Sequence, residues 1–356
     1  MKTLPLSGMV VAPDWADAII APAYDALDES GRRRHLDQHP HSFLGALPLG
    51  KPDTAALESC ARRIAEYRHN GQFLAPKGPF AALTRISEEG ISITGLVLDV
   101  PIGEFESTIL GHEKTRAERV GDLADFLRLV GIASSPVTVA HEPNPLTDAL
   151  AERFLPTPPY LESAADGASV TVWLLQPDDA ISAMDAVEAG IIVDGHHRTA
   201  AAHAAGSPSV LCAFVPADSL GSTGFDRVAH TVTTDVPSRI TATGLKVDAL
   251  NQPGRPTSSG RVHLFWDGKW FSISGWEEGT IDAAVIDEKI LGTALGISDF
   301  EVRPAIGPVP TAPLVITSHP PSWETLERMV RAGDTMPPKS TYFTPKMRSG
   351  VFLIDR

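Results

Sequence analysis

Residues 191–205 constrain the fold of this chain more than any other stretch of its sequence. Three β-branched residues at 191–193 are followed by Asp-Gly-His-His-Arg at 194–198 and then by an alanine-rich run. The apolar run predicts a buried strand, the glycine a tight turn, and the alanines the start of a helix. Together with 30 Pro and 29 Gly, which imply many turns, this element indicates an α+β chain rather than a helical bundle.

The predicted turn carries side chains that suit an anionic ligand. The first turn of a helix presents unpaired N–H groups and the positive end of a dipole, so it favours phosphate. Asp194 can orient a hydroxyl or hold a cation, and Arg198 can fork onto phosphate oxygens. The alternative is structural, because Asp194 can cap the helix and Gly195 can simply permit a left-handed turn. Two adjacent histidines beside an arginine favour the functional interpretation.

A second group of reactive residues, His112-Glu113-Lys114-Thr115, precedes a helix predicted over 120–130. Glu113 is a candidate general base, because burial in a cleft raises the pKa of a glutamate towards the operating pH. The alternative is a set of solvated charges at a helix start. Together with the Asp194 turn, this segment suits phosphoryl transfer to or from a small hydroxyl compound.

A third polar segment lies near residue 340. Lys339, Ser340, Thr341 and Lys346 combine two cations with two hydroxyls, which suits an anionic ligand. A solvated loop that closes onto the domain is the alternative.

Composition limits the classes of partner. A net charge of -14 argues against nucleic acid, whose recognition draws on clustered Lys and Arg. Cys60 and Cys212 show no metal-ligand spacing and are expected to be free thiols in a reducing compartment. The adjacent His196 and His197 would diverge on a regular element, so a structural zinc site is not expected. No signal peptide and no apolar run of membrane-spanning length is found, which predicts a cytoplasmic protein without a membrane partner.

The pattern of turns and periodicity predicts three regions. They are an N-terminal α+β region over 1–95, a catalytic domain over 96–245 and a C-terminal α+β domain over 246–356. Helices are expected to end near residue 38 and to cover 54–67, 120–130, 146–154, 180–188, 283–295 and 322–332. Strands are expected at 80–85, 91–100, 135–139, 170–175, 191–193, 210–215, 262–266, 269–273 and 350–354, with an Asp-Gly type I′ turn at 267–268. No P-loop or protein-kinase motif set occurs in the chain.

Five motifs together resemble a large bacterial family that carries the ParB/sulfiredoxin-like fold and is related to the free-serine kinase branch of that fold. They are Pro22-Ala23-Tyr24-Asp25, His39-Pro40-His41-Ser42-Phe43-Leu44, His112-Glu113-Lys114-Thr115, the Asp194–Arg198 turn, and Met336-Pro337-Pro338-Lys339-Ser340-Thr341-Tyr342-Phe343 through to Gly350. The resemblance implies a ParB/sulfiredoxin-like central domain with additional α+β regions at both ends. Two stretches depart from the family pattern. The stretch between Thr115 and the following helix is shorter than in the family, and residues 224–230 replace a Pro-Thr-His-Arg motif.

The resemblance also implies roles for individual residues. Glu113 would be the base, Asp194 would position the hydroxyl or Mg²⁺, and His196 and His197 would complete the catalytic group. The residues implied to bind nucleotide phosphate are Gly195, His197, Arg198 and Thr199. The residues implied to bind substrate are His112, Lys114, Thr115, Tyr24, Asp25, Lys339, Ser340, Thr341 and Lys346. ATP or ADP with Mg²⁺ would be the cofactors, and no metal-ligating residue is assigned with certainty.

Three functions follow from these patterns. The leading hypothesis is a phosphotransferase acting on serine or O-phosphoserine, in the manner of a serine kinase or a phosphoserine phosphatase. The alternatives are a non-catalytic nucleotide-binding regulator of the same fold and a scaffold with a degenerate site. Sulfinic-acid repair is not expected, because the turn holds histidine where sulfiredoxins hold cysteine. The direction of transfer and the oligomeric state stay open.

Overall fold

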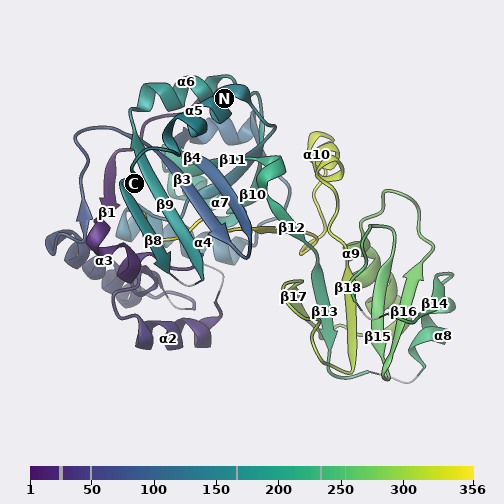
Figure 1. Ribbon diagram of the computed structural model, residues 1–356. Helices are drawn as coiled ribbons and strands as arrows, with labels where there is room; N and C mark the ends of the chain where they lie inside the picture. The colour runs from purple at the N-terminus through teal and green to yellow at the C-terminus, as the bar shows by residue number, and fades with distance from the viewer. Residues whose placement is uncertain (24–26, 49, 166, 233–234, 253) are drawn as a thin grey trace. The chain divides into compact units, whose positions relative to one another are not determined.

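The computed structural model describes residues 1–23, 27–48, 50–165, 167–232, 235–252 and 254–356 (Figure 1). These residues form two compact units. Unit 1 consists of residues 1–111, 115–220 and 344–356, and unit 2 consists of residues 112–114 and 221–343. The mixed α+β class predicted from the sequence is confirmed. The predicted boundaries at 95 and 245 stay a prediction about which parts fold independently, although one strand of unit 1 runs through residue 95.

The largest sheet among the described residues belongs to unit 1 and mixes parallel with antiparallel strands (Figure 1). In spatial order its strands are β5 (Ile109–Gly111), β10 (Gly190–Asp194), β7 (Val137–His141), β11 (Ser209–Pro216), β4 (Ile91–Pro101), β3 (Ala81–Glu88), β9 (Ala168–Leu175) and β8 (Leu161–Ala165). The central strands are buried along most of their length, as their continuous apolar sequences require. Leu98, Val139 and Phe214 lie in the resulting core and are at most 1% exposed.

A smaller sheet in unit 1 joins distant parts of the chain. Its spatial order is β2 (Phe73–Leu74), β1 (Gly8–Val11), β20 (Phe352–Asp355) and β6 (Ile132–Ala133). The antiparallel pairing of β20 with β1 returns residues 344–356 to unit 1 after the chain has passed through unit 2. This return places Lys346 in the same unit as the Asp194 turn.

The helices of unit 1 begin and end at residues that satisfy their free backbone groups. Asp53 caps α3, accepting from the N–H of Ala56 at 2.8 Å, and Gly131 ends α4 in the left-handed conformation. The helical segments are η1 (Pro13–Trp15), α1 (Ala16–Ile19), α2 (Glu29–Gln38), η2 (Phe43–Ala46), α3 (Thr54–His69), η3 (Ile102–Glu106), α4 (Ala117–Val130), α5 (Pro145–Phe154), α6 (Pro177–Asp185), α7 (His196–Ala205) and η4 (Ala217–Ser219). The long helices predicted from periodicity are confirmed, within a few residues at each end.

Unit 2 is built on an antiparallel sheet of its own (Figure 1). Its spatial order is β14 (Lys246–Leu250), β16 (Lys269–Ser274), β15 (Val262–Trp266), β18 (Leu314–Ser318), β13 (Phe225–Ala229) and β17 (Glu301–Pro304). The hairpin predicted at 262–273 is confirmed, with positive φ at both turn residues, Asp267 and Gly268. Unit 2 also contains a short strand pair, β12 (Gly221–Thr223) with β19 (Tyr342–Thr344), and the helices α8 (Val236–Thr241), α9 (Asp282–Ala284) and α10 (Trp323–Arg331).

The helix predicted over 283–295 has an unexpected geometry. After one turn of α-helix it continues as the π-helical segment η5 (Val285–Leu295), in which the Thr293 hydroxyl donates to the Glu288 carbonyl five residues earlier at 2.9 Å. Ile286, Ile290 and Leu291 face the core of unit 2 and are fully buried. The apolar pattern therefore predicted a buried helix but did not distinguish the two helical geometries. π-helical segments are rare and occur frequently at functional sites.

Candidate functional site

The predicted strand, turn and helix are present at the Asp194–Arg198 segment of unit 1. β10 ends at Asp194, Gly195 adopts φ +106°, and α7 begins at His196. A Cβ atom on Gly195 would lie 3.0 Å from Val137 Cγ2 and 3.1 Å from Arg198 Cζ. The positive φ therefore favours glycine here, and a side chain would in addition crowd Val137 and Arg198.

Asp194 is an ionised carboxylate held between two cations. Its Oδ1 lies 3.0 Å from the Lys346 ammonium, and its Oδ2 pairs with the Arg198 guanidinium. Burial acts to raise the pKa of Asp194, but Lys346 and Arg198 outweigh this effect and bring the pKa to about 2. The group of three side chains therefore carries one negative and two positive charges at neutral pH, an excess that attracts anions.

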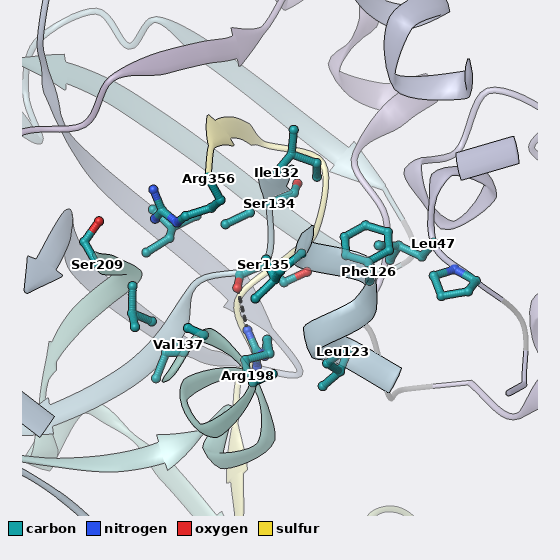
Figure 2. Close-up of a pocket in the computed structure, with 17 residues that line it drawn as sticks. Leu47, Leu123, Phe126, Ile132, Ser134, Ser135, Val137, Arg198, Ser209 and Arg356 are labelled. Atoms are coloured by element: carbon teal, nitrogen blue, oxygen red, sulfur yellow. Dashed lines mark hydrogen bonds between the residues drawn. The ribbon is translucent and has the colours of Figure 1, made fainter. Parts of the chain in front are cut away.

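Arg198 is anchored to the backbone as well as to Asp194. Its guanidinium donates to the carbonyls of Ser135, at 2.7 Å, and Pro136, in the segment that leads into β7 (Figure 2). The side chain is 23% exposed. The contacts in this structure make Arg198 a support for the turn, whereas its predicted role as a phosphate ligand stays a prediction.

The two histidines of the turn diverge, as adjacent residues on a helix must. His196 is buried, and its Cδ2 lies 3.3 Å from the position that a Cβ on Gly111 would take. His197 accepts a hydrogen bond at Nε2 from the backbone N–H of Arg116, at 3.0 Å. An accepting Nε2 places the proton of a neutral ring on Nδ1. Thr199 begins the helical hydrogen bonding, with its N–H donating to the Gly195 carbonyl at 3.0 Å.

An apolar cavity of about 80 Å³ in unit 1 was not predicted from the sequence. Leu123 and Phe126 of α4, Val137 of β7 and Ala201 of α7 contribute to its wall, and so does Arg198 (Figure 2). Its lining residues come from several separate segments, so no local motif could have revealed it.

In unit 2, two predicted motifs lie against each other. The backbone N–H of Met336 donates to the His112 carbonyl at 2.8 Å, and the His112 ring packs edge-on against Phe343, with 6.2 Å between ring centroids. Glu113 is half-buried and Lys114 is exposed. Thr115, the last residue of the motif, belongs to unit 1 and is exposed.

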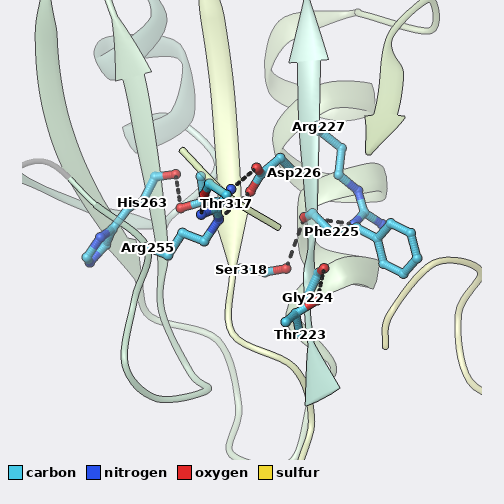
Figure 3. Close-up of polar contacts among 10 residues, drawn as sticks. Thr223, Gly224, Phe225, Asp226, Arg227, Arg255, His263, Thr317 and Ser318 are labelled. Atoms are coloured by element: carbon cyan, nitrogen blue, oxygen red, sulfur yellow. Dashed lines mark hydrogen bonds and ion pairs between the residues drawn. The ribbon is translucent and has the colours of Figure 1, made fainter. Parts of the chain in front are cut away.

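A buried arginine connects the Lys339 segment to the rest of unit 2. Arg227 of β13 forms a forked ion pair with Asp287 of η5, with distances of 2.9 Å from Nε to Oδ1 and 3.0 Å from Nη2 to Oδ2. Its Nη1 donates to the carbonyls of Lys339, at 3.0 Å, and Phe225, at 3.3 Å. Figure 3 shows Arg227 and Asp226 leaving opposite sides of the strand. Asp287 was missed by the sequence analysis, since it lies 60 residues from Arg227 along the chain.

The predicted substrate-binding residues of this segment differ in exposure. Lys339 is exposed, adopts φ +56°, and places its ammonium 5.4 Å from the centroid of the Phe225 ring. Ser340 is buried and donates to the Pro337 carbonyl at 2.6 Å, which indicates a local structural role. Thr341 is half-buried. Tyr24 and Asp25, also predicted to bind substrate, lie outside the described residues.

The side chains that could bind a metal ion bear on the predicted Mg²⁺ cofactor. Both oxygens of Asp194 face cations, which disfavours the coordination of Mg²⁺ by this carboxylate. Within the described ranges, no three His, Cys, Asp or Glu side chains cluster so that they could hold a metal ion. Cys60 and Cys212 are buried free thiols, as predicted. None of the helices in the described part of the chain combines the length and apolar character needed to cross a bilayer.

Several solved structures are similar to the chain at low sequence identity. A variant of free serine kinase in complex with ADP is 15% identical with a TM-score of 0.41, and the match covers 73% of this chain and 91% of that one. SbnI with a C-terminal truncation, from Staphylococcus aureus, is 12% identical with a TM-score of 0.45, covering 73% and 87%. A conserved hypothetical protein from Pyrococcus furiosus is 16% identical with a TM-score of 0.39, covering 73% and 94%.

No curated protein matches the chain. The model of one protein family does match, over residues 4–285, which is well over half of the sequence. The chain therefore belongs to the family described as "Protein of unknown function (DUF1015)".

Proposed function

We propose that this protein is a small-molecule phosphotransferase that acts on serine or O-phosphoserine. We also propose that it has a ParB/sulfiredoxin-like fold. The observation that carries the proposal is the Asp194 centre, in which an ionised carboxylate is accompanied by two cations beside the first turn of α7. Preorganised positive charge and backbone N–H groups stabilise a transferring phosphoryl group. The order of the motifs, which resembles that of the free-serine kinases, also supports the proposal.

The proposed step assigns one role to each group. Glu113 accepts the proton of the serine hydroxyl while the hydroxyl oxygen attacks the terminal phosphorus of the nucleotide. A bond forms between that oxygen and phosphorus, and the bond from phosphorus to the bridging oxygen breaks, so that ATP leaves as ADP or ADP leaves as AMP. Asp194 orients the substrate, while Gly195, His196, His197, Arg198 and Thr199 form the turn that faces nucleotide phosphate. No step is assigned to Mg²⁺.

The test is ³¹P NMR of the purified protein under two conditions, with Mg²⁺ included in both. One sample contains serine with ATP or ADP, and the other contains O-phosphoserine with or without ADP. A phosphoserine signal from serine, or free phosphate or new nucleotide from phosphoserine, supports the proposal and gives the direction of transfer. Unchanged spectra with intact nucleotide binding would favour the alternative, a non-catalytic nucleotide-binding regulator. Unchanged spectra without nucleotide binding would favour a scaffold.

A further inference from the structure

The apolar cavity of unit 1 borders the Asp194 centre without being part of it. The cavity measures about 80 Å³ and is lined by Ala201 and Ala202 of α7 and by Leu123 and Phe126 of α4, two helices that pack against each other (Figure 2). Protein interiors hold few voids larger than a water molecule, because the lining of a void loses van der Waals contacts. A space that the chain's own side chains leave open therefore costs stability unless another molecule occupies it.

The polar side chains of the cavity wall have hydrogen-bond partners within the fold, beginning with two serines. The Ser134 hydroxyl accepts from the backbone N–H of Gly350 at 2.9 Å. The Ser135 hydroxyl lies 2.6 Å from that of Ser349. A water molecule needs about two to four polar partners to be held in a cavity, so these satisfied groups favour a dry site.

The third serine and the two arginines of the wall are paired in the same way (Figure 2). Arg356 forms an ion pair with Asp99, with 3.1 Å between Nη1 and Oδ2, and the Ser209 hydroxyl donates to the same oxygen at 3.4 Å. Arg198 donates to Asp194 and to two backbone carbonyls. A charged occupant would have to compete for cations that already face carboxylates, whereas an uncharged apolar occupant needs only contact with the apolar walls.

The size of the cavity limits the occupant further. Its volume is about half that of an engineered apolar cavity of about 150 Å³ that stays dry and binds benzene or xenon. This favours an aliphatic group of about three or four carbons over an aromatic ring.

Helix α7 links the cavity to the Asp194 centre. Ala201 and Ala202 lie three and four residues after Arg198 and so share its face of the helix. The Arg198 side chain itself lines the cavity, and its guanidinium pairs with Asp194. One side chain is therefore in reach of both a molecule in the cavity and the carboxylate of the centre.

We propose that this cavity is a regulatory binding site for a small uncharged aliphatic group of about three or four carbons. The occupant holds Arg198 in its contact with Asp194 and thereby strengthens anion binding at the Asp194 centre. By thermodynamic linkage, an anion bound at the centre strengthens binding in the cavity by the same factor. The site itself goes beyond the proposed phosphoryl transfer, whereas its effect on anions rests on the role proposed for the Asp194 centre.

The first measurement tests whether the cavity binds an apolar probe. Full-length protein labelled with ¹³C at its alanine, leucine and valine methyl groups is titrated with xenon and followed by NMR. We expect saturable shifts of Leu123, Val137 and Ala201, which line the cavity, and unchanged signals from Leu264 in the core of unit 2. The absence of saturable shifts at the lining residues would overturn the proposal.

Two further probes test the chemical class of the ligand. Propan-2-ol and acetate have the same number of non-hydrogen atoms and a similar shape, but only acetate is charged. Propan-2-ol should shift the same methyl signals and bind at least about tenfold more tightly than acetate. Equal affinities, or tighter binding of acetate, would refute the uncharged class.

A pair of variants on α7 tests the place of binding. Ala201→Val fills part of the cavity, whereas Ala204→Val adds the same side chain at an exposed position of the same helix. Both variants carry the cost of a β-branched residue in a helix, so they are matched. We expect Ala201→Val to weaken xenon binding at least about fivefold and to melt about 2 °C or more above Ala204→Val.

Equal xenon affinities in the two variants would place the probe elsewhere and overturn the site. Should Ala201→Val not fold, the methyl shifts of the wild-type protein still decide whether the cavity is occupied.

The link to the Asp194 centre is measured at the Nε–H group of Arg198 by ¹⁵N NMR, with Arg198→Lys to assign the signal. Xenon should shift this signal and slow its exchange with water about two- to fivefold, whereas Arg153, an exposed arginine paired with Asp179, is the control and should not respond. The affinity for inorganic pyrophosphate, measured by calorimetry, should rise about two- to threefold when xenon occupies the cavity. If either the Arg198 signal or the pyrophosphate affinity stays unchanged at saturating xenon, the regulatory role is refuted.

Failure of this inference differs from failure of the proposed function. If pyrophosphate does not bind the wild-type protein, the anion role of the Asp194 centre is refuted, and the xenon and Arg198 signals still decide the cavity. If xenon fills the cavity and moves the Arg198 signal while no ³¹P spectrum of the substrates changes, the site stands and the phosphotransferase activity is refuted.

Discussion

The Asp194 centre of unit 1 has two cations for one carboxylate, whereas the Arg227 centre of unit 2 has one cation for one carboxylate. Asp194 receives two cations, Lys346 and Arg198, and keeps an excess positive charge beside a helix start. Arg227 receives one carboxylate and two backbone carbonyls, so its charge is balanced. The first arrangement suits the attraction of an anion, whereas the second suits the fixing of chain segments. The difference lies in which partner is in excess, not in the types of residue.

The largest expected effect concerns the proposed base. Glu113 is half-buried, and Glu113→Gln should lower turnover by about 10²–10⁴-fold while leaving the thermal unfolding temperature unchanged. Turnover is measured by ³¹P NMR with the substrates that the wild-type protein converts. Glu118→Gln, at an exposed position on α4, is the control and should retain full activity. Retained turnover in Glu113→Gln would remove Glu113 from the mechanism.

The second prediction compares the stability that each of the two centres loses when its arginine is replaced. Arg227→Met removes the cation paired with Asp287 and the donor to the Phe225 and Lys339 carbonyls, and should lower the free energy of unfolding by about 3–5 kcal/mol. Arg198→Met should cost less, about 1–3 kcal/mol, because Asp194 keeps Lys346 as a partner. Urea denaturation of both variants measures the two values.

The double variant Arg227→Met/Asp287→Leu sharpens this result. Since an apolar pair can replace a buried ion pair at little cost, the double variant should recover part of the stability that Arg227→Met loses. Equal losses in Arg227→Met and Arg198→Met would show that the two centres do not differ in the way that their contacts indicate.

The sequence predicted a centre well when its residues lie close together along the chain, and poorly when they lie far apart. Asp194 and Arg198 are four residues apart at the start of one helix, so their pairing could be inferred from the local pattern. Asp287 lies 60 residues and Lys339 112 residues from Arg227, and only the folded chain brings them together. The motifs therefore identified Lys339 but not the residues that hold it.

The same distinction explains the errors in secondary structure. Long periodic helices such as α3 and the Asp-Gly hairpin were predicted correctly, because spacing and turn residues determine them locally. Short strands such as β5 and β17 were missed, since their pairing partners rather than their own sequences define them. The π-helical geometry of η5 was missed because its apolar spacing resembles that of an α-helix.

A third prediction concerns Asp282 of unit 2. Among the residues that the structure describes, no cation is hydrogen-bonded to its carboxylate. Burial raises the pKa of Asp282 to about 6, against the lowering effect of the Gly260 N–H, which donates to Oδ1 at 3.0 Å. The folded state then holds a proton that the unfolded state has released, so stability falls as the pH rises from about 4 to about 6. The loss is about 3 kcal/mol. In Asp282→Asn this part of the pH dependence should be absent from urea denaturation curves, and a slope that persists would assign it to another group.

The smallest predicted effect has the opposite sign and comes from Asp194. Its pKa of about 2 lies below the ordinary pKa of an aspartate, so its contribution to stability is complete above about pH 5 and is lost as the pH falls through about 2. The contribution is on the order of 2 kcal/mol, and Asp194→Asn should remove it at all pH values, leaving a flatter curve between pH 2 and 5. A matched series of denaturation curves for Asp194→Asn and Asp282→Asn measures both slopes. If both variants flatten the curve in the same direction, then burial rather than the number of paired cations controls the pKa of both carboxylates. The excess positive charge of the Asp194 centre would then no longer support the proposed binding of an anion there.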